Sequence, residues 1–497
     1  MKRLSPFSIG IYLSMILCVI GIITLNYMAL PSGDEIGTAD SAINFVLHGE
    51  WWSAVWIYTY HPLHNFILVP WLYIFGVSHV SVCALDIVIA LIATIVGLKA
   101  LKDRKLLNNP LLAVAFVLLI WGFIPYYNGR IDNLMMLFTI GMADYIIPSS
   151  ELRRHEYRML AFYTFMLTMT GIYTLPVMFL LCLCLVAFYW KNKTMRAILI
   201  KKSWIVFLSC LIAFILVCSF YLFNQRLLRF LQTYIRFNSN FNKGMANMRR
   251  HFSTSEMIIN GYKNIWPILF SLLGILYGGI KKNWNLFSLS VFVLLIPVTL
   301  SLVGHYVSYY YWLFSVSSIV ILYYVLVTMG KKTAIVIIAF FSLCYYGYPI
   351  IRSFASSPSK PEKTAELKGF LIKNKQYLKD SIFVHFEAQI DAPLYYLLQE
   401  YPVKISGKVR FLENYVDPKI VFKKTMESKI SDSHTREVCM DIFYKIENTV
   451  EPPLDKGLII ISDVPRYKQL TERLNSMKMP FECVSTYKNY KMIRFGY

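Results

Sequence analysis

Two adjacent carboxylates, Asp34 and Glu35, follow the first long apolar run of the chain, in the stretch LPSGDEIGTADSAINFVLHGEWW that begins at Leu30. A carboxylate beside a hydroxyl group can take its proton as the oxygen attacks, and it can also ligate a hard divalent cation. The same pair can instead be a solvated cap on a helix at the membrane surface. The choice between these interpretations depends on how the rest of the chain is arranged.

Other groups suited to a phosphate or a cation lie close to the ends of further apolar runs. Asp132 and Arg130 stand in the turn PYYNGRID, where Asp132 can also be an ordinary helix N-cap. The loop 224–250 holds six basic residues, and three of them share one helical face with Thr233, namely Arg226, Arg229 and Arg236. Such a face can bind anionic lipid headgroups or hold a phosphate group.

The composition indicates a polytopic membrane protein. Of the 497 residues, 56% are apolar and only 16% are charged, and the mean hydropathy is +0.49. Roughly a quarter of the residues of a soluble domain are charged. The net charge of +21 could indicate nucleic acid, but the basic residues mostly lie between apolar runs, which favours membrane anchoring and no nucleic-acid partner. The nine cysteines follow no metal-binding spacing.

The positions of the basic residues predict the topology. The apolar run 6–30 follows a basic start, so we expect a retained first span that begins in the cytoplasm. Further spans are predicted near residues 79–100, 110–127, 132–148, 159–173, 175–190, 203–223, 264–280, 284–304, 310–329 and 333–351. About eleven crossings then place every basic cluster in the cytoplasm, at residues 102–105, 153–158, 191–202, 281–282 and 331–332.

One stretch of this pattern allows two interpretations. Residues 159–190 can form one overlong helix or two short ones, and a single crossing would put the lysines of 191–202 outside. Gly171 and Pro176, in the segment TGIYTLP, provide a break. We therefore predict two helices.

The same alternation places the loop 31–78, the loop 224–262 and everything after Arg352 outside the membrane. In the tail, the stretches SIFVHF, YPVKI and GLIIISD have the pattern of short buried strands, with helical patterns between them. This predicts a small α/β domain. The expected division is a transmembrane domain over residues 1–351 and an extracytoplasmic α/β domain over 352–497. Cys439 and Cys483 of this tail could pair if the compartment oxidises thiols.

Three motifs in the first part of the chain resemble the GT-C class of membrane glycosyltransferases. They are the acidic pair of Gly33-Asp34-Glu35 soon after the first span, the segment HPLHNFILVPWLYIFG from His61 to Gly76, and the turn GRIDNLMMLFT. The resemblance covers roughly residues 1–190. It is strongest to the branch of the class that includes the protein O-mannosyltransferases and the lipid A aminoarabinose transferases. It weakens after this stretch, although the span pattern and the tail still fit the class.

The resemblance implies a chain that takes a sugar from a polyprenyl-phosphate carrier at the outer side of the membrane. Asp34 would be the base that takes the acceptor proton, with Glu35 sharing or supporting this role. The departing lipid phosphate needs a metal ion or a basic clamp. Candidates for the clamp are Arg130, Arg226, Arg229, Arg236 and His61. A divalent metal (Mg²⁺, Mn²⁺ or Zn²⁺) bound through Asp34 and Asp132 is compatible with these oxygen ligands, although no spacing demands it.

One base and a good leaving group permit a single displacement with inversion at the anomeric carbon, whereas a retaining or inverting glycosidase would need two carboxylates flanking the bond. The acceptor would be a surface glycan or a lipid, of the O-antigen or lipid A type, and the site would lie at the bacterial inner membrane. His64 and Asp86 are weaker candidates, because both can be structural.

Three other functions remain as alternatives. A transporter would be expected to show internal repeats and charges at mid-membrane depth, and the sequence shows no such repeat. A ligase or polymerase that moves a whole glycan from a diphosphate carrier would also suit the basic loop 224–250. A non-catalytic assembly protein could use the tail as a binding module.

Overall fold

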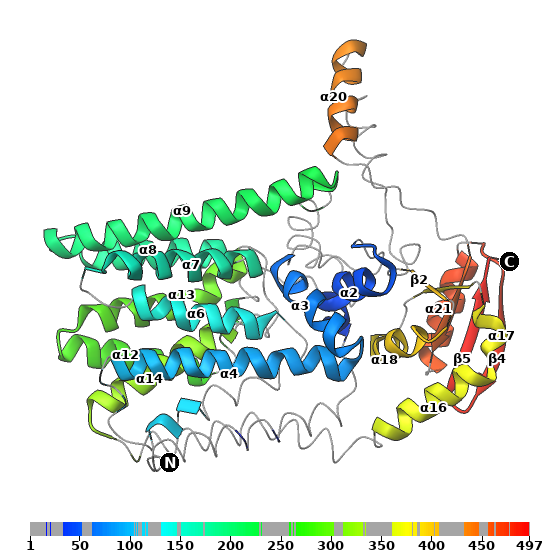
Figure 1. Ribbon diagram of the computed structural model, residues 1–497, viewed down its shortest axis with the longest axis horizontal. Coiled ribbons are helices and arrows are strands. Elements are labelled where there is room, and N and C mark those ends of the chain that lie inside the picture. Colours follow the sequence, from blue (N-terminus) through cyan, green and yellow to red (C-terminus); the bar gives the residue numbers. More distant parts are fainter. Residues whose placement is uncertain are drawn as a thin grey trace.

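The computed structural model describes the chain in segments. These are residues 33–51, 62–103, 131–146, 151–171, 174–227, 265–302, 312–331, 360–379, 381–384, 388–401, 403–406, 432–446, 456–461, 464–476 and 478–496, with isolated positions between them. The predicted first span, most of 110–127 and nearly all of 333–351 lie outside the described residues. Figure 1 shows a bundle of long helices, two short helices at one end of it, and a small sheet beyond these.

The bundle consists of helices that run back and forth along the long axis of the molecule (Figure 1). Their bounds are α4 His79–Asp103, α6 Asp132–Ile146, α7 Arg154–Thr170, α8 Thr174–Phe188, α9 Lys193–Phe223, α12 Ile265–Ile280, α13 Trp284–Leu302 and α14 Trp312–Thr328. The short helices at the end are α2 Gly33–His48 and α3 Pro62–Phe75. Each of these helices begins or ends near a predicted span or amphipathic segment, so the local pattern of apolar residues determines the elements.

The bundle buries hydroxyl groups and exposes large apolar side chains. Thr164, Thr168 and Ser290 are fully buried, whereas Trp204, Ile212 and several other apolar residues along α9 are about half exposed. Two of these hydroxyls donate to the backbone of their own helices, Thr168 Oγ1 to the carbonyl of Thr164 at 3.0 Å and Ser290 Oγ to the carbonyl of Leu286 at 2.7 Å. Exposing this apolar surface to water would be unfavourable, whereas the hydrocarbon chains of lipids can cover it.

Three of the described helices are long and apolar enough to cross a membrane, namely α4, α9 and α13. Four shorter apolar helices accompany them, at Pro62–Phe75, Asn133–Ile146, Thr174–Phe188 and Ile265–Ile280. The chain is therefore a helical membrane protein, and the number of eleven crossings stays a prediction. Helix α9 begins ten residues before the predicted span 203–223, because Asn192 caps it through a hydrogen bond from the Met195 amide and the basic segment that follows consists of good helix formers.

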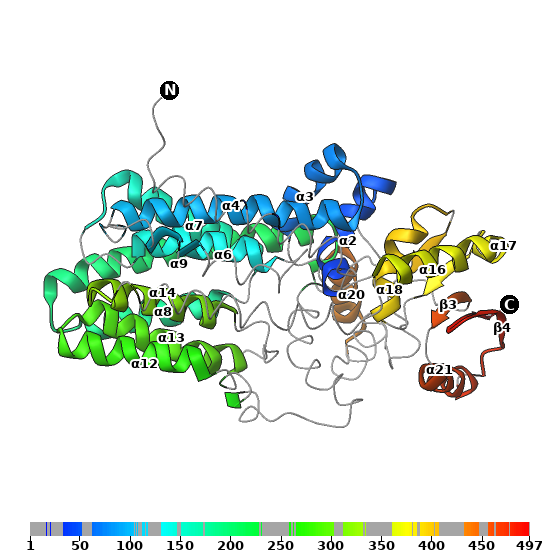
Figure 2. The same ribbon diagram turned by 90° about the horizontal axis from the view of Figure 1, so that it is seen from below.

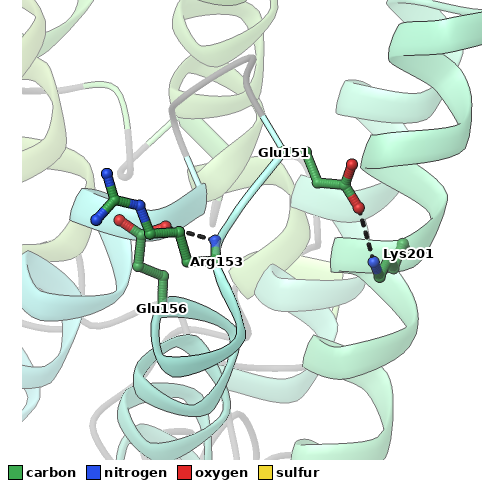
Figure 3. A network of polar contacts seen from close by, with 4 residues as sticks. All are labelled: Glu151, Arg153, Glu156 and Lys201. Carbon is green, nitrogen blue, oxygen red and sulfur yellow. Dashed lines mark hydrogen bonds and ion pairs between the residues drawn. The ribbon is translucent and has the colours of Figure 1, made fainter.

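The basic clusters lie at the end of the bundle opposite to α2 and α3. Figure 3 shows two contacts at this end: Glu151 forms an ion pair of 2.8 Å with Lys201 of α9, and the Glu156 carboxylate accepts a hydrogen bond from the Arg153 amide. The start of α13 also meets the end of α8 here, through a hydrogen bond from the Tyr189 hydroxyl to Asn285. The clusters thus share one end, as the topology requires, and the side of the membrane on which they lie stays a prediction.

The break between α7 and α8 is confirmed. Helix α7 ends at Thr170, Gly171 leaves the helix in an extended conformation, and α8 begins at Thr174. The Thr174 hydroxyl donates to the carbonyl of Gly171 at 2.7 Å and closes the turn. Pro176 falls in the first turn of α8, where a missing amide hydrogen costs no helical bond.

The tail forms a C-terminal α/β region over residues 360–496. Its five-stranded sheet has the order β2-β1-β3-β5-β4, built from β1 Ile382–Val384, β2 Lys404–Ser406, β3 Gly457–Ile461, β4 Phe481–Tyr487 and β5 Tyr490–Phe495. Strand β1 is parallel to β2 and β3, and β5 is antiparallel to both β3 and β4. The three strands predicted from sequence are β1, β2 and β3, whereas the final hairpin of β4 and β5 was not predicted.

Helices cover both faces of this sheet (Figure 2). One face packs against α16 Lys360–Lys373, α17 Lys375–Leu378 and α18 Ala388–Leu398, and the other packs against α21 Val464–Ser476. Strand β3 is apolar throughout because alternate side chains enter the two cores. The helix α20 Ser433–Ile446 carries Cys439, and Cys439 and Cys483 are both free thiols in this structure.

Candidate functional site at the α2 end of the bundle

The acidic pair lies in the first turn of a helix. Asp34 and Glu35 are the second and third residues of α2, and their side chains lie outside the described residues. The first turn of a helix has unpaired amide groups and the positive end of the helix dipole. This environment stabilises an ionised carboxylate, which is the form that a general base or a cation ligand requires. It equally suits a simple helix cap.

Position 34 shares a helical face with two buried polar residues of α2. Thr38 and Ser41 follow it at intervals of four and three residues, which brings all three positions onto one face. Thr38 and Ser41 are 4% and 1% exposed, and every residue from 38 to 43 is at most 4% exposed, so α2 is buried on all sides at this turn. The acidic first turn of α2 therefore leads directly into a buried segment of the helix, and a functional role of Asp34 stays a prediction.

Helix α3 is hydrogen-bonded to α2 through two polar side chains. The Oδ1 atom of Asn65 accepts a hydrogen bond from the Ala42 amide at 3.1 Å, and the imidazole of His64 hydrogen-bonds to the backbone of Thr38. In a regular helix the amide of residue 42 would be served by the carbonyl of residue 38. The two side chains of α3 therefore reach the same turn of the α2 backbone and fix α2 relative to α3.

His64 is neutral in this site. Burial lowers the pKa of its imidazole from 6.5 to about 4, against a smaller opposing effect of the hydrogen bond to Thr38. At neutral pH the ring adds no positive charge close to α2. It is therefore a structural hydrogen-bonding group here, and it is poorly suited to hold a phosphate as a cation.

The ends of several bundle helices that lie away from the basic clusters meet α2 and α3. Phe66 of α3 and Trp51 both lie against Phe220 near the end of α9, with ring centroids 5.6 and 6.2 Å apart, respectively. Asp132 is the first residue of α6, and α6 begins at this same end of the bundle (Figure 1). The predicted acidic residues thus belong to one end of the molecule, although the side chain of Asp132 lies outside the described residues.

The basic loop begins directly beside this end. The chain turns sharply at Gln225, where φ is 54°, and the Arg226 amide donates to the carbonyl of Tyr221 at 2.8 Å. Phe230 then stacks on Tyr221 with ring centroids 4.3 Å apart, so the first turn of the loop packs on α9. The guanidinium of Arg226 is partly exposed at this turn. Four other clamp candidates lie outside the described residues, namely His61, Arg130, Arg229 and Arg236.

Sequence reasoning missed one acidic residue of this site. Asp40 of α2 is 1% exposed, and its negative charge helps to raise the pKa of Tyr395 in α18 well above 10, although burial of the phenol has the larger effect. The signal in the sequence was the set of small and apolar neighbours in ADSAINF, which is typical of a buried helical turn. Asp86 of α4 is also buried, as predicted for a charged group within a span.

The described residues contain no metal centre. Among the side chains that the structure describes, no group of three or more His, Cys, Asp or Glu residues is placed to hold a metal ion. A metal bound through Asp34 and Asp132 stays a prediction, because both side chains lie outside this set.

A bundle of this kind, with two short helices between it and a terminal α/β region, can be compared with known structures. The fold resembles that of ArnT. The crystal structure of ArnT from Cupriavidus metallidurans bound to undecaprenyl phosphate superposes with a TM-score of 0.58 over 97% of this chain and 97% of that chain, at 11% identity.

The likeness to ArnT extends over both the bundle and the C-terminal α/β region, because it covers nearly the whole of each chain. At 11% identity it shows a common fold and nothing finer. No protein-family profile matches the sequence, and no curated protein matches it. The fold expected from the three motifs is therefore supported by a structural likeness that the sequence comparisons do not detect.

Proposed function

We propose that this protein is a GT-C glycosyltransferase that takes a sugar from a polyprenyl-phosphate carrier. The acceptor is a surface glycan or a lipid, of the O-antigen or lipid A type, at the outer face of the cytoplasmic membrane. The observation that carries the proposal is the likeness, over 97% of both chains, to ArnT with undecaprenyl phosphate bound. The acidic first turn of α2, at the end of the bundle away from the basic clusters, supports it independently.

Asp34 acts as the general base in this proposal. The acceptor hydroxyl loses its proton to the carboxylate of Asp34 as its oxygen attacks the anomeric carbon, and the bond from that carbon to the carrier phosphate breaks. A single displacement of this kind inverts the configuration of the sugar. The first turn of α2 keeps Asp34 ionised and ready to accept the proton, and Glu35 beside it orients the acceptor.

The basic loop after α9 holds the departing phosphate. Arg226 lies where the loop packs on α9, and a guanidinium there can form charge-assisted hydrogen bonds that strengthen as the phosphate gains charge. Arg130, Arg229, Arg236 and His61 complete the proposed clamp. Asp132 at the start of α6 would ligate a divalent metal together with Asp34 if one takes part, and no step above depends on it.

Transfer from defined lipid-linked donors tests the proposal directly. The purified chain in detergent should consume a polyprenyl-monophosphate sugar in the presence of lipopolysaccharide, release polyprenyl phosphate, and attach the sugar with inverted configuration. A panel of donors with different sugars would identify the substrate. Consumption of a diphosphate-linked glycan alone would show a ligase or polymerase, and movement of a solute across vesicles without transfer would show a transporter.

A further inference from the structure

Helix α18 belongs to two hydrophobic cores at once. Leu394 and Leu398, four residues apart, are fully buried in the core of the C-terminal sheet. Tyr395, the next residue round the helix, is 3% exposed and belongs instead to the core of the bundle, which includes Ala39 and Ala42 of α2. One face of α18 therefore packs on the sheet and an adjacent face packs on the bundle.

A second aromatic residue widens the contact of α18 with the bundle. The ring of Tyr396 lies 6.2 Å, centroid to centroid, from the ring of His79 at the start of α4. Tyr395 and Tyr396 are themselves in edge contact, with centroids 5.9 Å apart. The pair thus touches both α2 and the beginning of a long bundle helix, so the C-terminal α/β region is anchored to two elements of the site end.

Tyr395 also lies within electrostatic reach of Asp40 of α2. Asp40 is almost completely buried, and its carboxylate acts electrostatically on the phenol of Tyr395, which burial and this charge keep protonated. A protonated phenol is compatible with a neighbouring carboxylate, whereas a phenolate would repel it. The contact between α18 and α2 therefore combines apolar packing with a favourable polar neighbourhood.

The contact of α18 with α2 lies close, along the helix, to the acidic first turn. Asp40 follows Asp34 by six residues, or about 9 Å along a helix. On its other side α2 is held by Asn65 and His64 of α3. A short helix held at its middle from two sides moves as one body, so a shift at the α18 contact also shifts the first turn.

We propose that the packing of Tyr395 of α18 on the middle of α2 is the joint through which the C-terminal α/β region positions the acidic first turn of α2. Tyr395 is a positioning residue in this proposal and touches no reacting group. An acceptor that engages the C-terminal α/β region can then change the alignment of Asp34 through α18. The effect on turnover rests on the proposed function, whereas the effect on α2 itself does not.

Hydrogen exchange of the full chain in detergent tests the joint without reference to activity. Tyr395→Ala should raise the exchange of the α2 amides after residue 38 by about tenfold or more, because local opening becomes easier. Tyr395→Phe keeps the ring and should stay within about twofold of the wild type. The matched control is Tyr377→Ala, which truncates a tyrosine that packs only on the sheet core, and it should leave α2 exchange unchanged.

Turnover of the same variants tests the positioning role. Tyr395→Ala should lower kcat by about tenfold or more and leave the KM for the lipid-linked donor within about twofold, because alignment is lost and binding is kept. Unchanged α2 exchange in Tyr395→Ala would overturn the joint, and raised exchange with unchanged kcat would overturn the positioning role. A wild-type chain that transfers no sugar would overturn the proposed function instead, while the exchange result would still decide the joint.

Discussion

The amide of Ala42, in the middle of α2, donates a hydrogen bond of 3.1 Å to the side-chain oxygen of Asn65 on α3. Both residues are buried, and Asn65 is 2% exposed. A side-chain acceptor on one helix thus serves a backbone donor on another, next to the turn at which His64 contacts Thr38. This bond gives α2 a fixed register against α3, and α2 is the helix that carries the acidic pair.

Replacing Asn65 should loosen α2. Asn65→Ala removes the side-chain acceptor of the buried Ala42 amide, and the loss of such a hydrogen bond costs about 0.5–1.5 kcal/mol of the free energy of unfolding. The expected result is a lower thermal midpoint in detergent and faster exchange of the Ala42 amide. Asn44→Ala is a matched control on the same helix, because Asn44 donates to the carbonyl of Glu50 at an exposed position. Equal shifts in both variants would contradict a special role for Asn65.

His64 should make the stability of the protein depend on pH. Its pKa is about 4 in the folded chain and 6.5 when exposed, so the unfolded chain takes up a proton first as the pH falls. The stabilisation by neutral His64 is complete above pH 6.5 and is lost progressively toward pH 4. The total loss is about 3 kcal/mol.

Thermal midpoints measured from pH 8 to pH 4 in detergent test this dependence. His64→Gln keeps a neutral hydrogen-bonding side chain and removes the titration, so its midpoints should fall less steeply below pH 6.5 than those of the wild type. His155→Gln is a suitable control, since His155 is exposed at the far end of the bundle. Parallel curves for the wild type and His64→Gln would rule out a buried neutral His64.

The sequence predicted those features that depend on local pattern. Gly171 and Pro176 predicted the break between α7 and α8, because glycine and proline interrupt a helix at the place where they stand in the sequence. The packing of Tyr395 in the core of the bundle could not be predicted, because it depends on how α18 of the tail packs against α2. Single-sequence patterns carry no information on such distant packing.

The candidate site was predicted in part for the same reason. The helical context of Asp34 and the start of α6 at Asp132 follow from capping and apolar periodicity near each residue. The hydrogen bonds of Asn65 and His64 with α2 depend on the mutual placement of two helices. The sequence identified the segment from His61 to Gly76 only as a motif that resembles the GT-C class. The hairpin of β4 and β5 was missed because it lies in a tail segment with many charged residues.

A native thiol can test the topology. Cys483 is exposed on β4, whereas Cys83, Cys184 and Cys210 are buried in the bundle. A membrane-impermeant maleimide applied to intact spheroplasts should label Cys483, because the C-terminal α/β region is expected outside. A cysteine introduced as Lys282→Cys, in a basic turn at the opposite end, should be labelled only after permeabilisation. The reverse pattern would place α2 and its acidic pair in the cytoplasm.

Arg226 should matter for the donor more than for the acceptor. Charge-assisted contacts of this kind are worth about 1.5–3 kcal/mol, so Arg226→Ala should raise the KM for the lipid-linked donor by about tenfold to a hundredfold. The KM for the acceptor should change little. Arg196→Ala is the control, because Arg196 lies in the first turns of α9, at the end of that helix far from Arg226, with its guanidinium 4.9 Å from the centroid of the Trp190 ring. Equal losses for both substrates would leave the loop as a membrane anchor.

Asp34 provides the most direct test of the chemistry. Asp34→Asn keeps nearly the same shape and removes the ability to accept a proton, so transfer should slow by at least about a hundredfold. Donor binding should persist, because the base acts on the acceptor. Glu35→Gln should be milder if Glu35 only orients the acceptor. Asp132→Asn should weaken donor binding as well as rate if Asp132 holds a metal, and excess divalent metal should then restore part of the rate.

A loss of activity in Asp34→Asn has a second explanation, namely a less stable α2. An acidic residue in the first turn stabilises its helix by about 0.3–1 kcal/mol. Thermal midpoints and α2 exchange of Asp34→Asn separate the two effects. A variant with near-wild-type exchange and slow transfer has lost the base. Asp34→Glu should restore part of the rate only if the carboxylate reaches the acceptor. Near-normal turnover by well-folded Asp34→Asn would remove Asp34 from the chemistry and leave Glu35 as the remaining candidate base.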